Sequence, residues 1–169
     1  LFVGKNHQYM LFFTQKGKCF WMRVYEIPEG SRTSKGRAIQ NLINIEQDDK
    51  VKAFICTKDL KDEDYINKHY VIMATKKGQV KKTSLEKYSR PRVNGINAIT
   101  IKEGDELLVA KLTNGESQIM MALKSGKAIR FEEAKTRPMG RSASGVRGIR
   151  LQHDKDEVVG MVSVNDMNS

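Results

Sequence analysis

The chain has 169 residues, and its 30 Lys and Arg against 20 Asp and Glu give a net charge of +10 and a pI near 9.6. This balance favours an anionic partner, with nucleic acid ahead of an anionic membrane surface. No apolar run approaches the roughly 20 residues of a transmembrane helix. Residues 1–5 have neither the charged lead nor the apolar length of a signal peptide. We therefore expect no membrane partner.

The cysteines indicate where such a chain resides, and the first residues indicate whether it is part of a longer protein. Cys19 and Cys56 form neither a dense disulfide framework nor a Cys-x-x-Cys pair, so a reduced, cytoplasmic location is the simplest inference. The chain lacks an initiator Met and opens in a strand-like run. We expect it to be an excised part of a longer protein.

Three segments of the chain begin with the same pattern. Each has an apolar run, a basic or polar pair, a glycine and a second strand-like run. This pattern predicts a β-hairpin in which the glycine supplies the turn. The runs start at Tyr9, Tyr70 and Gln118, and the turn glycines are Gly17, Gly78 and Gly126.

A long basic loop with a second glycine follows each hairpin. In the third segment it spans residues 140–150, Gly-Arg-Ser-Ala-Ser-Gly-Val-Arg-Gly-Ile-Arg, with three glycines, three arginines and no carboxylate. Glycines permit close backbone approach, and arginines offer planar donor forks that suit phosphate oxygens. A further apolar segment, an acidic turn and a closing strand complete the repeat. The matching loops span residues 30–37 and 89–95.

The repeat predicts an all-β fold, a propeller-like array of four-stranded antiparallel blades of which about three are present. Helical periodicity is poor, so we expect no more than a short helical turn such as residues 84–88. Asn114-Gly115 is a strong turn signal between the second and third units. The expected divisions are residues 1–3, the end of a preceding blade; 4–55, a blade; 56–68, a polar insertion; 69–115, a blade; and 116–169, a blade and the start of the next connection.

Catalytic chemistry finds little support in the sequence. His7, His69 and His153 stand at unrelated points of the repeat, and a lone surface His is usually solvated. No phosphate-binding Gly-x-x-x-x-Gly-Lys-Ser/Thr loop and no metal-ligand cluster of Cys or His is present. The acids fall in turns and in the insertion, where we expect them to be solvated. We assign no catalytic or metal-binding residue.

The basic residues recur at equivalent places of the repeat. One interpretation is a set of solvated faces, but recurrence favours a basic rim that follows a phosphate backbone without reading sequence. A curved rim would also bend the duplex. The candidate DNA-binding residues are Lys16, Lys18, Arg32, Lys35, Arg37, Lys76, Lys77, Lys81, Lys82, Arg90, Arg92, Lys127, Arg130, Arg137, Arg141, Arg147 and Arg150.

These loops resemble a known family. Gly-Arg-x-x-x-Gly-Val-Arg-Gly-Ile at 140–149 and Ser-Lys-Gly-Arg-Ala-Ile at 34–39 are similar to the DNA gyrase A C-terminal domain, and all three units align with it. The resemblance implies a β-pinwheel whose outer edge wraps duplex DNA and supports ATP-dependent negative supercoiling by the whole type II topoisomerase. The family's basic box, Gln-Arg-Arg-Gly-Gly-Lys-Gly, is absent here, as expected for a chain that starts after the first blade.

The resemblance also implies which partners the parent enzyme has and which activities this part should lack by itself. In the parent enzyme the partners are double-stranded DNA, a second gyrase A chain and the gyrase B chain. ATP and Mg²⁺ belong to that parent, so this part should need no cofactor and should not be an enzyme by itself. Two alternatives stay open: the matching C-terminal domain of topoisomerase IV, and a β-propeller protein-interaction module.

Overall fold

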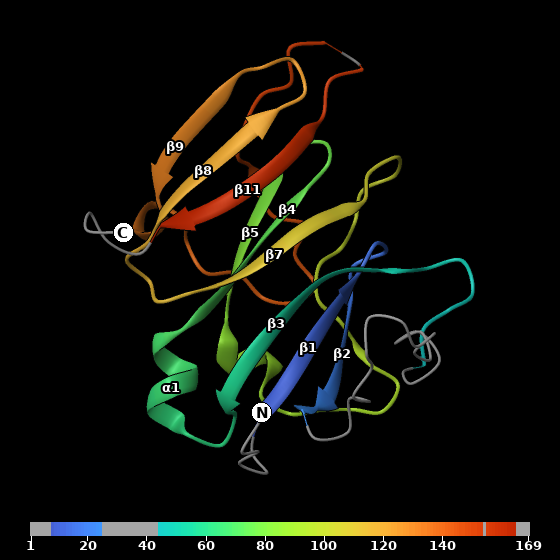
Figure 1. Cartoon of the computed structure of the whole chain (residues 1–169), viewed down its shortest axis with the longest axis vertical. Helices are drawn as coiled ribbons and strands as arrows, with labels where there is room; N and C mark the ends of the chain where they lie inside the picture. The colour runs from blue at the N-terminus through green and yellow to red at the C-terminus, as the bar shows by residue number, and fades with distance from the viewer. Residues whose placement is uncertain (1–7, 25–43, 154, 165–169) are drawn as a thin grey trace, which may run out of the picture.

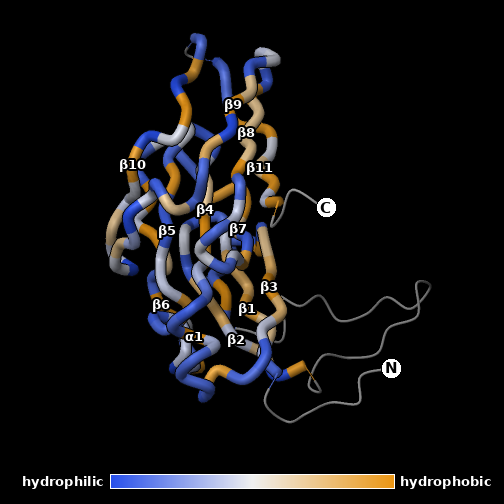
Figure 2. The backbone as a smooth tube through the Cα atoms, turned by 90° about the vertical axis from the view of Figure 1, so that its left-hand side faces the viewer, coloured by the Kyte–Doolittle hydropathy of each residue, from blue (hydrophilic) through white to orange (hydrophobic). Residues whose placement is uncertain are grey.

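The computed structural model describes residues 8–24, 44–153 and 155–164, and they form antiparallel β-sheets (Figure 1). The three sheets follow one another along the long axis of the molecule (Figures 1 and 2). The all-β, blade-like prediction is confirmed. In order across each sheet, the strands are β3 (Val51–Asp59), β1 (Gln8–Thr14), β2 (Lys18–Arg23) and β6 (Ile96–Asn97); β10 (Val146–Arg147), β5 (Gln79–Ser84), β4 (Tyr70–Thr75) and β7 (Leu107–Thr113); and β11 (Val158–Val164), β8 (Gln118–Leu123) and β9 (Ala128–Glu132).

The predicted hairpins are the pairs β1–β2, β4–β5 and β8–β9. Their turn residues Gly17, Gly78 and Gly126 have φ of +92°, +98° and +98°. A residue with a Cβ rarely adopts this left-handed backbone. The glycine therefore fixes the hairpin turn in each unit, as the repeat predicts.

Two of the sheets take their outer strand from the following unit. Strand β6 belongs to the second unit in sequence but pairs with β2 of the first, and β10 of the third unit pairs with β5 of the second. The expectation that one contiguous unit supplies all four strands of a blade is therefore wrong for these sheets. Sequence periodicity counts strands but does not say which neighbour each one joins.

The exchanged strands are held at the hairpin turns. The carbonyl oxygen of Gly17 accepts hydrogen bonds from the backbone N–H groups of Ala98 and Ile99, at 2.8 and 3.1 Å. The Gly78 carbonyl accepts from Gly148 and Ile149 in the same way, at 2.7 and 3.4 Å. Each of these two turn glycines thus shapes its own hairpin and also receives the next unit.

The segment expected to be a polar insertion, residues 56–68, is more ordered than predicted. Strand β3 continues to Asp59, and helix α1 (Glu63–Lys68) follows. The Asp62 side chain caps the helix, while Leu60 and Ile66 are buried against the first and second sheets. The predicted helical turn is a 3₁₀-helix, η3 (Leu85–Tyr88), and a second one, η4, spans Glu133–Lys135.

The apolar side chains form a core at each junction between sheets. One cluster joins the first and second sheets around Phe13, Met73 and Tyr88. Another joins the second and third sheets around Ile72 and Met121. The middle sheet is therefore packed on both faces, and this packing buries two lysines of the candidate site.

Candidate nucleic-acid interface

A recurring aspartate holds each hairpin turn. Asp49 accepts a hydrogen bond from the backbone N–H of Lys16 at 3.1 Å, and Asp105 accepts from that of Lys77 at 2.9 Å. Asp156 accepts from the N–H of Ser125 at 3.0 Å. Each of the three also accepts from the residue that follows it.

All three acids were expected to be solvated, and that expectation is wrong for two of them. Only 6% of Asp49 and 1% of Asp156 is exposed. Burial alone would raise the pKa of Asp156, but hydrogen bonds from Gln152, Ser125 and Glu157 lower that pKa to about 2. Their recurrence at one place of the repeat is the signal that could have identified them.

Several turn lysines are neutralised by nearby acids. The Lys16 ammonium lies 2.6 Å from Asp48 and 3.2 Å from Glu46, and these side-chain hydrogen bonds raise its pKa. The Lys76 ammonium lies 2.5 Å from Glu106, which likewise raises the Lys76 pKa. A third turn lysine, Lys18, lies 3.8 Å from Glu46. Such pairs reduce the net positive charge that these turns present at the surface.

Two further candidates are inside the protein. Lys81 is fully buried, and its ammonium donates to the carbonyl oxygens of Ala98 and Arg141. Lys82 is 4% exposed; its ammonium donates to the Glu133 carbonyl oxygen at 3.3 Å and lies 3.7 Å from the carboxylate of the same residue. Strand β5 is covered on both faces, so neither alternate position reaches the surface. The assignment of Lys81 and Lys82 as DNA contacts is therefore wrong for this structure.

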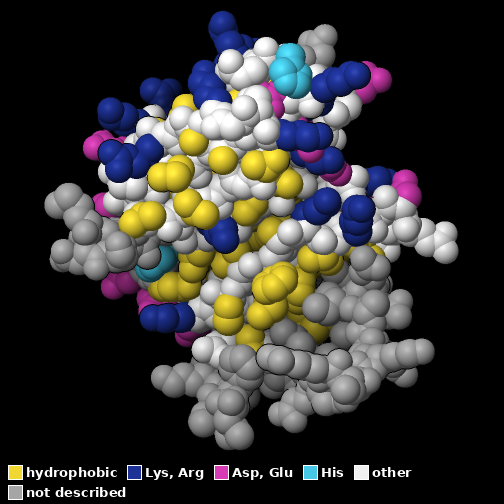
Figure 3. All heavy atoms as spheres, turned by 45° about the horizontal axis from the view of Figure 1, so that its top comes forward, with side chains coloured by type: hydrophobic (Ala, Val, Ile, Leu, Met, Phe, Trp, Pro, Cys, Tyr) yellow, Lys and Arg dark blue, Asp and Glu magenta, His cyan; other side chains and the backbone are white. Residues whose placement is uncertain are grey.

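The remaining described candidates lie at the surface, mostly on the long loops and outer edges. Arg90 is paired with Glu86 at 3.0 Å, and Arg141 is half-buried. Arg32, Lys35 and Arg37 lie outside the described residues. Figure 3 shows Lys and Arg side chains around the margin of one face, with an apolar band between them. Besides the acid-paired Lys16, the exposed candidates are Lys77, Arg90, Arg92, Lys127, Arg130, Arg137, Arg147 and Arg150.

The exchanged strands place two equivalent residues at the outer edges of their sheets. Arg147 on β10 is exposed and lies opposite Gln79. Asn97 on β6 is exposed and lies opposite Lys18. Because Gln79 and Lys18 each follow a hairpin glycine, the two edges present matching positions. This repetition along the outer edge is the geometry that a basic track requires.

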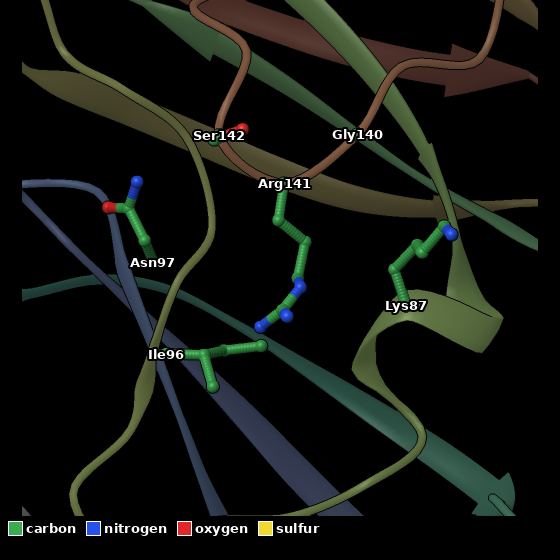
Figure 4. A pocket seen from close by; sticks show the side chains of 6 residues that line it. All are labelled: Lys87, Ile96, Asn97, Gly140, Arg141 and Ser142. Carbon is green, nitrogen blue, oxygen red and sulfur yellow. The ribbon is translucent and has the colours of Figure 1, made fainter.

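A cleft of about 490 Å³ opens between the second unit and the basic loop of the third. In Figure 4 the Arg141 side chain extends from the loop toward Ile96, with Lys87 on the neighbouring 3₁₀-helix. The sequence pattern did not single out Lys87, Asn97 or Ser142. The lining residues are Lys87, Ile96, Asn97, Gly140, Arg141 and Ser142.

The described ranges offer no sign of a metal centre or a membrane span. Among residues 8–24, 44–153 and 155–164, no group of three His, Cys, Asp or Glu side chains could hold a metal ion. In the same ranges, no helix is both long and apolar enough to cross a membrane.

Comparison with known sequences identifies relatives of the chain. The family described as "DNA gyrase C-terminal domain, beta-propeller" matches residues 8–58, 69–114 and 118–165. The DNA gyrase A protein of Salmonella typhimurium is 42% identical over 162 residues, 96% of this chain and 18% of that protein. The DNA gyrase A protein of Staphylococcus aureus is 43% identical over 92% of this chain and 17% of its own length. The chain therefore spans less than a fifth of these relatives.

Solved structures agree in fold. The C-terminal domain of DNA topoisomerase IV superposes with a TM-score of 0.81 at 27% identity, covering 95% of this chain and 48% of that one. A DNA gyrase A C-terminal domain gives 0.75 at 22% identity, covering 95% and 49%. Because this second structure is only 22% identical in sequence, the comparison with it supports the fold and nothing more. With the sequence match across all three units, the chain belongs to the family of DNA gyrase A C-terminal domains.

Proposed function

We propose that this chain binds duplex DNA without reading its sequence, as part of the DNA-wrapping domain of a gyrase A protein. The observation that supports this most directly is the exposed set of arginines and lysines on the long loops and exchanged strands. The carboxylates at the hairpin turns are largely occupied by backbone N–H groups or by the turn lysines. Apart from Arg90, which pairs with Glu86, these exposed residues supply uncompensated positive charge along the outer edges, where a phosphate backbone could follow it.

The chemistry favours phosphate contact over base readout. The one α-helix in the described ranges has six residues, so those ranges offer no long recognition helix to read bases in the major groove. Arginine forks suit phosphate oxygens and position a duplex without specifying its sequence. Contacts spread along a curved edge would favour a bent duplex, with the bending cost offset by the additional contacts.

The parent reaction follows from family membership as a proposal. We place ATP, Mg²⁺, strand cleavage and ligation in other parts of a gyrase, whose partners in the cytoplasm are the gyrase B chain and a second gyrase A chain. The wrap would support ATP-dependent negative supercoiling by the whole enzyme. The equivalent C-terminal domain of topoisomerase IV is the second candidate, because a solved domain of that enzyme superposes well at 27% identity.

Binding can be measured by fluorescence anisotropy with two duplexes of equal length and unrelated sequence. We expect similar affinities and a log–log salt slope of roughly −0.9 for each phosphate neutralised. Titrations at four or more salt concentrations give the slope. A flat salt response, or a strong preference for one duplex, would contradict the proposal.

A further inference from the structure

The cleft beside Arg141 is a cationic site without a counter-ion. Its lining contains Arg141 and Lys87 and no carboxylate. In the described part of the chain, neither side chain forms an ion pair with an acid. Arg141 is half-buried, and removing a guanidinium from water is unfavourable unless an anion or acceptors replace the lost hydration. The cleft is therefore electrostatically suited to an anion.

The loop that carries Arg141 is held from the inside. The buried Lys81 ammonium donates to the Arg141 carbonyl oxygen at 2.6 Å, and the Thr100 hydroxyl donates to that of Ser142 at 2.5 Å. The Thr100 backbone N–H also donates to the Ala143 carbonyl oxygen at 3.2 Å. These bonds fix the loop before a ligand arrives, which lowers the ordering cost of binding. Lys81 is thus a positioning residue and not a ligand contact.

The repeat builds a related cleft one unit further on. Lys87 and Lys135 stand at the same place, nine residues after Gly78 and Gly126. The second cleft, of about 230 Å³, is lined by Lys135 and Arg147 among others. Arg147 occupies the position on its exchanged strand that Asn97 has in the first cleft. The second cleft has no counterpart of residues 140–142, so the repeat accounts for the lysine and the strand position, and Arg141 is particular to the first cleft.

We propose that the cleft of Lys87, Asn97, Arg141 and Ser142 binds a phosphate group. The Arg141 side chain extends into the cleft (Figure 4) and would supply the bidentate donor. Lys87, Asn97 and Ser142 line the same cleft and would turn toward a bound phosphate, adding a second charge and neutral hydrogen bonds. This proposal rests on the proposed function, because the natural source of the phosphate is then a phosphodiester of the bound duplex. A free phosphate compound presents the same chemistry, and the experiment separates the two sources.

The first arm measures duplex affinity and salt slope for Arg141→Gln and Lys87→Gln. The matched control is Lys111→Gln, an exposed lysine on β7, at the opposite edge of its sheet from β10. Hydrogen bonds to charged groups are strong, so we expect the Arg141 variant to bind about tenfold more weakly and to lose about one unit of slope. The Lys87 variant should change in the same direction, and their combined loss should be non-additive because both contact one group.

The second arm titrates the wild-type chain with pyrophosphate and follows the side-chain amide of Asn97 by NMR. Saturable shifts in the wild type that vanish in Arg141→Gln support the site. If the duplex binds and neither arm depends on Arg141 or Lys87, the cleft proposal is overturned while the proposed function stands. If pyrophosphate binds but the duplex does not, the phosphate site stands and the proposed function fails. Lys87 is exposed, so its variant stays informative if Arg141→Gln does not fold.

Discussion

The ammonium group of Lys81 donates a hydrogen bond of 2.6 Å to the carbonyl oxygen of Arg141. This bond joins a buried strand of the second unit to the long basic loop of the third. Lysine is a residue type usually found at the surface, but Lys81 is buried and supports the backbone of an arginine that faces a cleft. Because an ammonium donates a stronger hydrogen bond than a neutral amine, the protonation state of Lys81 affects both the stability of the fold and the loop that carries Arg141.

The first prediction concerns the pH dependence of stability. Burial, and next the charge of Arg141, lower the pKa of Lys81 to about 7, whereas the unfolded value is about 10.4. Between these values the unfolded chain binds more protons than the folded one, so this group makes the free energy of unfolding rise with pH. We expect Lys81→Met to show a smaller rise than wild type between pH 7 and 10.

Urea unfolding monitored by fluorescence measures this rise, because Trp21 is the only tryptophan and its indole donates to the Tyr88 carbonyl oxygen at 2.8 Å. Lys111→Met, which removes an exposed lysine, serves as the control and should keep the wild-type pH dependence. Equal pH dependence in Lys81→Met and wild type would contradict a buried, easily deprotonated Lys81.

The second prediction uses two glycines that share φ +98° but differ in surroundings. A Cβ on Gly78 would lie 2.5 Å from the Ile149 carbonyl oxygen, whereas a Cβ on Gly126 meets nothing within 4 Å. Gly126→Ala should cost only the left-handed backbone, about 1–2 kcal/mol. Gly78→Ala should cost about 1–3 kcal/mol more, because overpacking is added. Chemical denaturation of both variants measures the difference, and equal losses would argue against tight docking of the exchanged strand.

The third prediction concerns acid stability. The folded-state pKa of Asp156 is about 2, below the unfolded value of about 3.9. The stabilisation from this carboxylate is therefore present above about pH 4 and is lost as pH falls toward 2. Asp156→Asn should be less stable than wild type at pH 7, and the two proteins should converge in acid. Thermal unfolding from pH 7 to 2.5 tests this, with the exposed Glu103→Gln as a control that follows wild type.

The hairpins, their glycines and the all-β class could be predicted from sequence because each depends on residues close together in the chain. Alternating apolar runs and a glycine at the turn contain that information locally. The pairing of β6 with β2 could not be predicted, because two backbone N–H groups from a distant segment bind the Gly17 carbonyl. Nothing in the side-chain pattern encodes a partner for a carbonyl oxygen.

The surface exposure of the candidate residues could be predicted only for those on the long loops. Arg147 and its neighbours in residues 140–150 lie at the surface as expected, with Arg141 half-buried. Lys81 and Lys82 do not, since a strand packed on both faces buries adjacent residues, and lysine is usually an exposed type. Lys87 was missed because its importance comes from the loop packed beside it, not from its own segment.

The fourth prediction exchanges the two equivalent edge positions. Arg147→Gln should weaken duplex binding and reduce the magnitude of the salt slope by about one. Asn97→Arg places an arginine at the matching position of the neighbouring sheet and should increase the slope magnitude by about one. Anisotropy titrations at several salt concentrations measure both, with Lys111→Gln as control. Opposite shifts would support one track along the outer edges, whereas an effect of Arg147 alone would indicate a single local contact.

The last prediction separates binding from wrapping. The chain covers 48% and 49% of the two solved domains that it superposes on, so an arc built on its three sheets is shorter than theirs. Bending a duplex requires contacts spread along such an arc to offset the elastic cost. We therefore expect this 169-residue chain to bind DNA but to constrain little writhe. Closed circular DNA relaxed by a topoisomerase in its presence should show little change in linking number, against a clear positive shift with an intact gyrase A C-terminal domain. A shift as large as that of the intact domain would show that three sheets suffice to wrap the duplex, and the outer edges described here would then not be the whole binding surface.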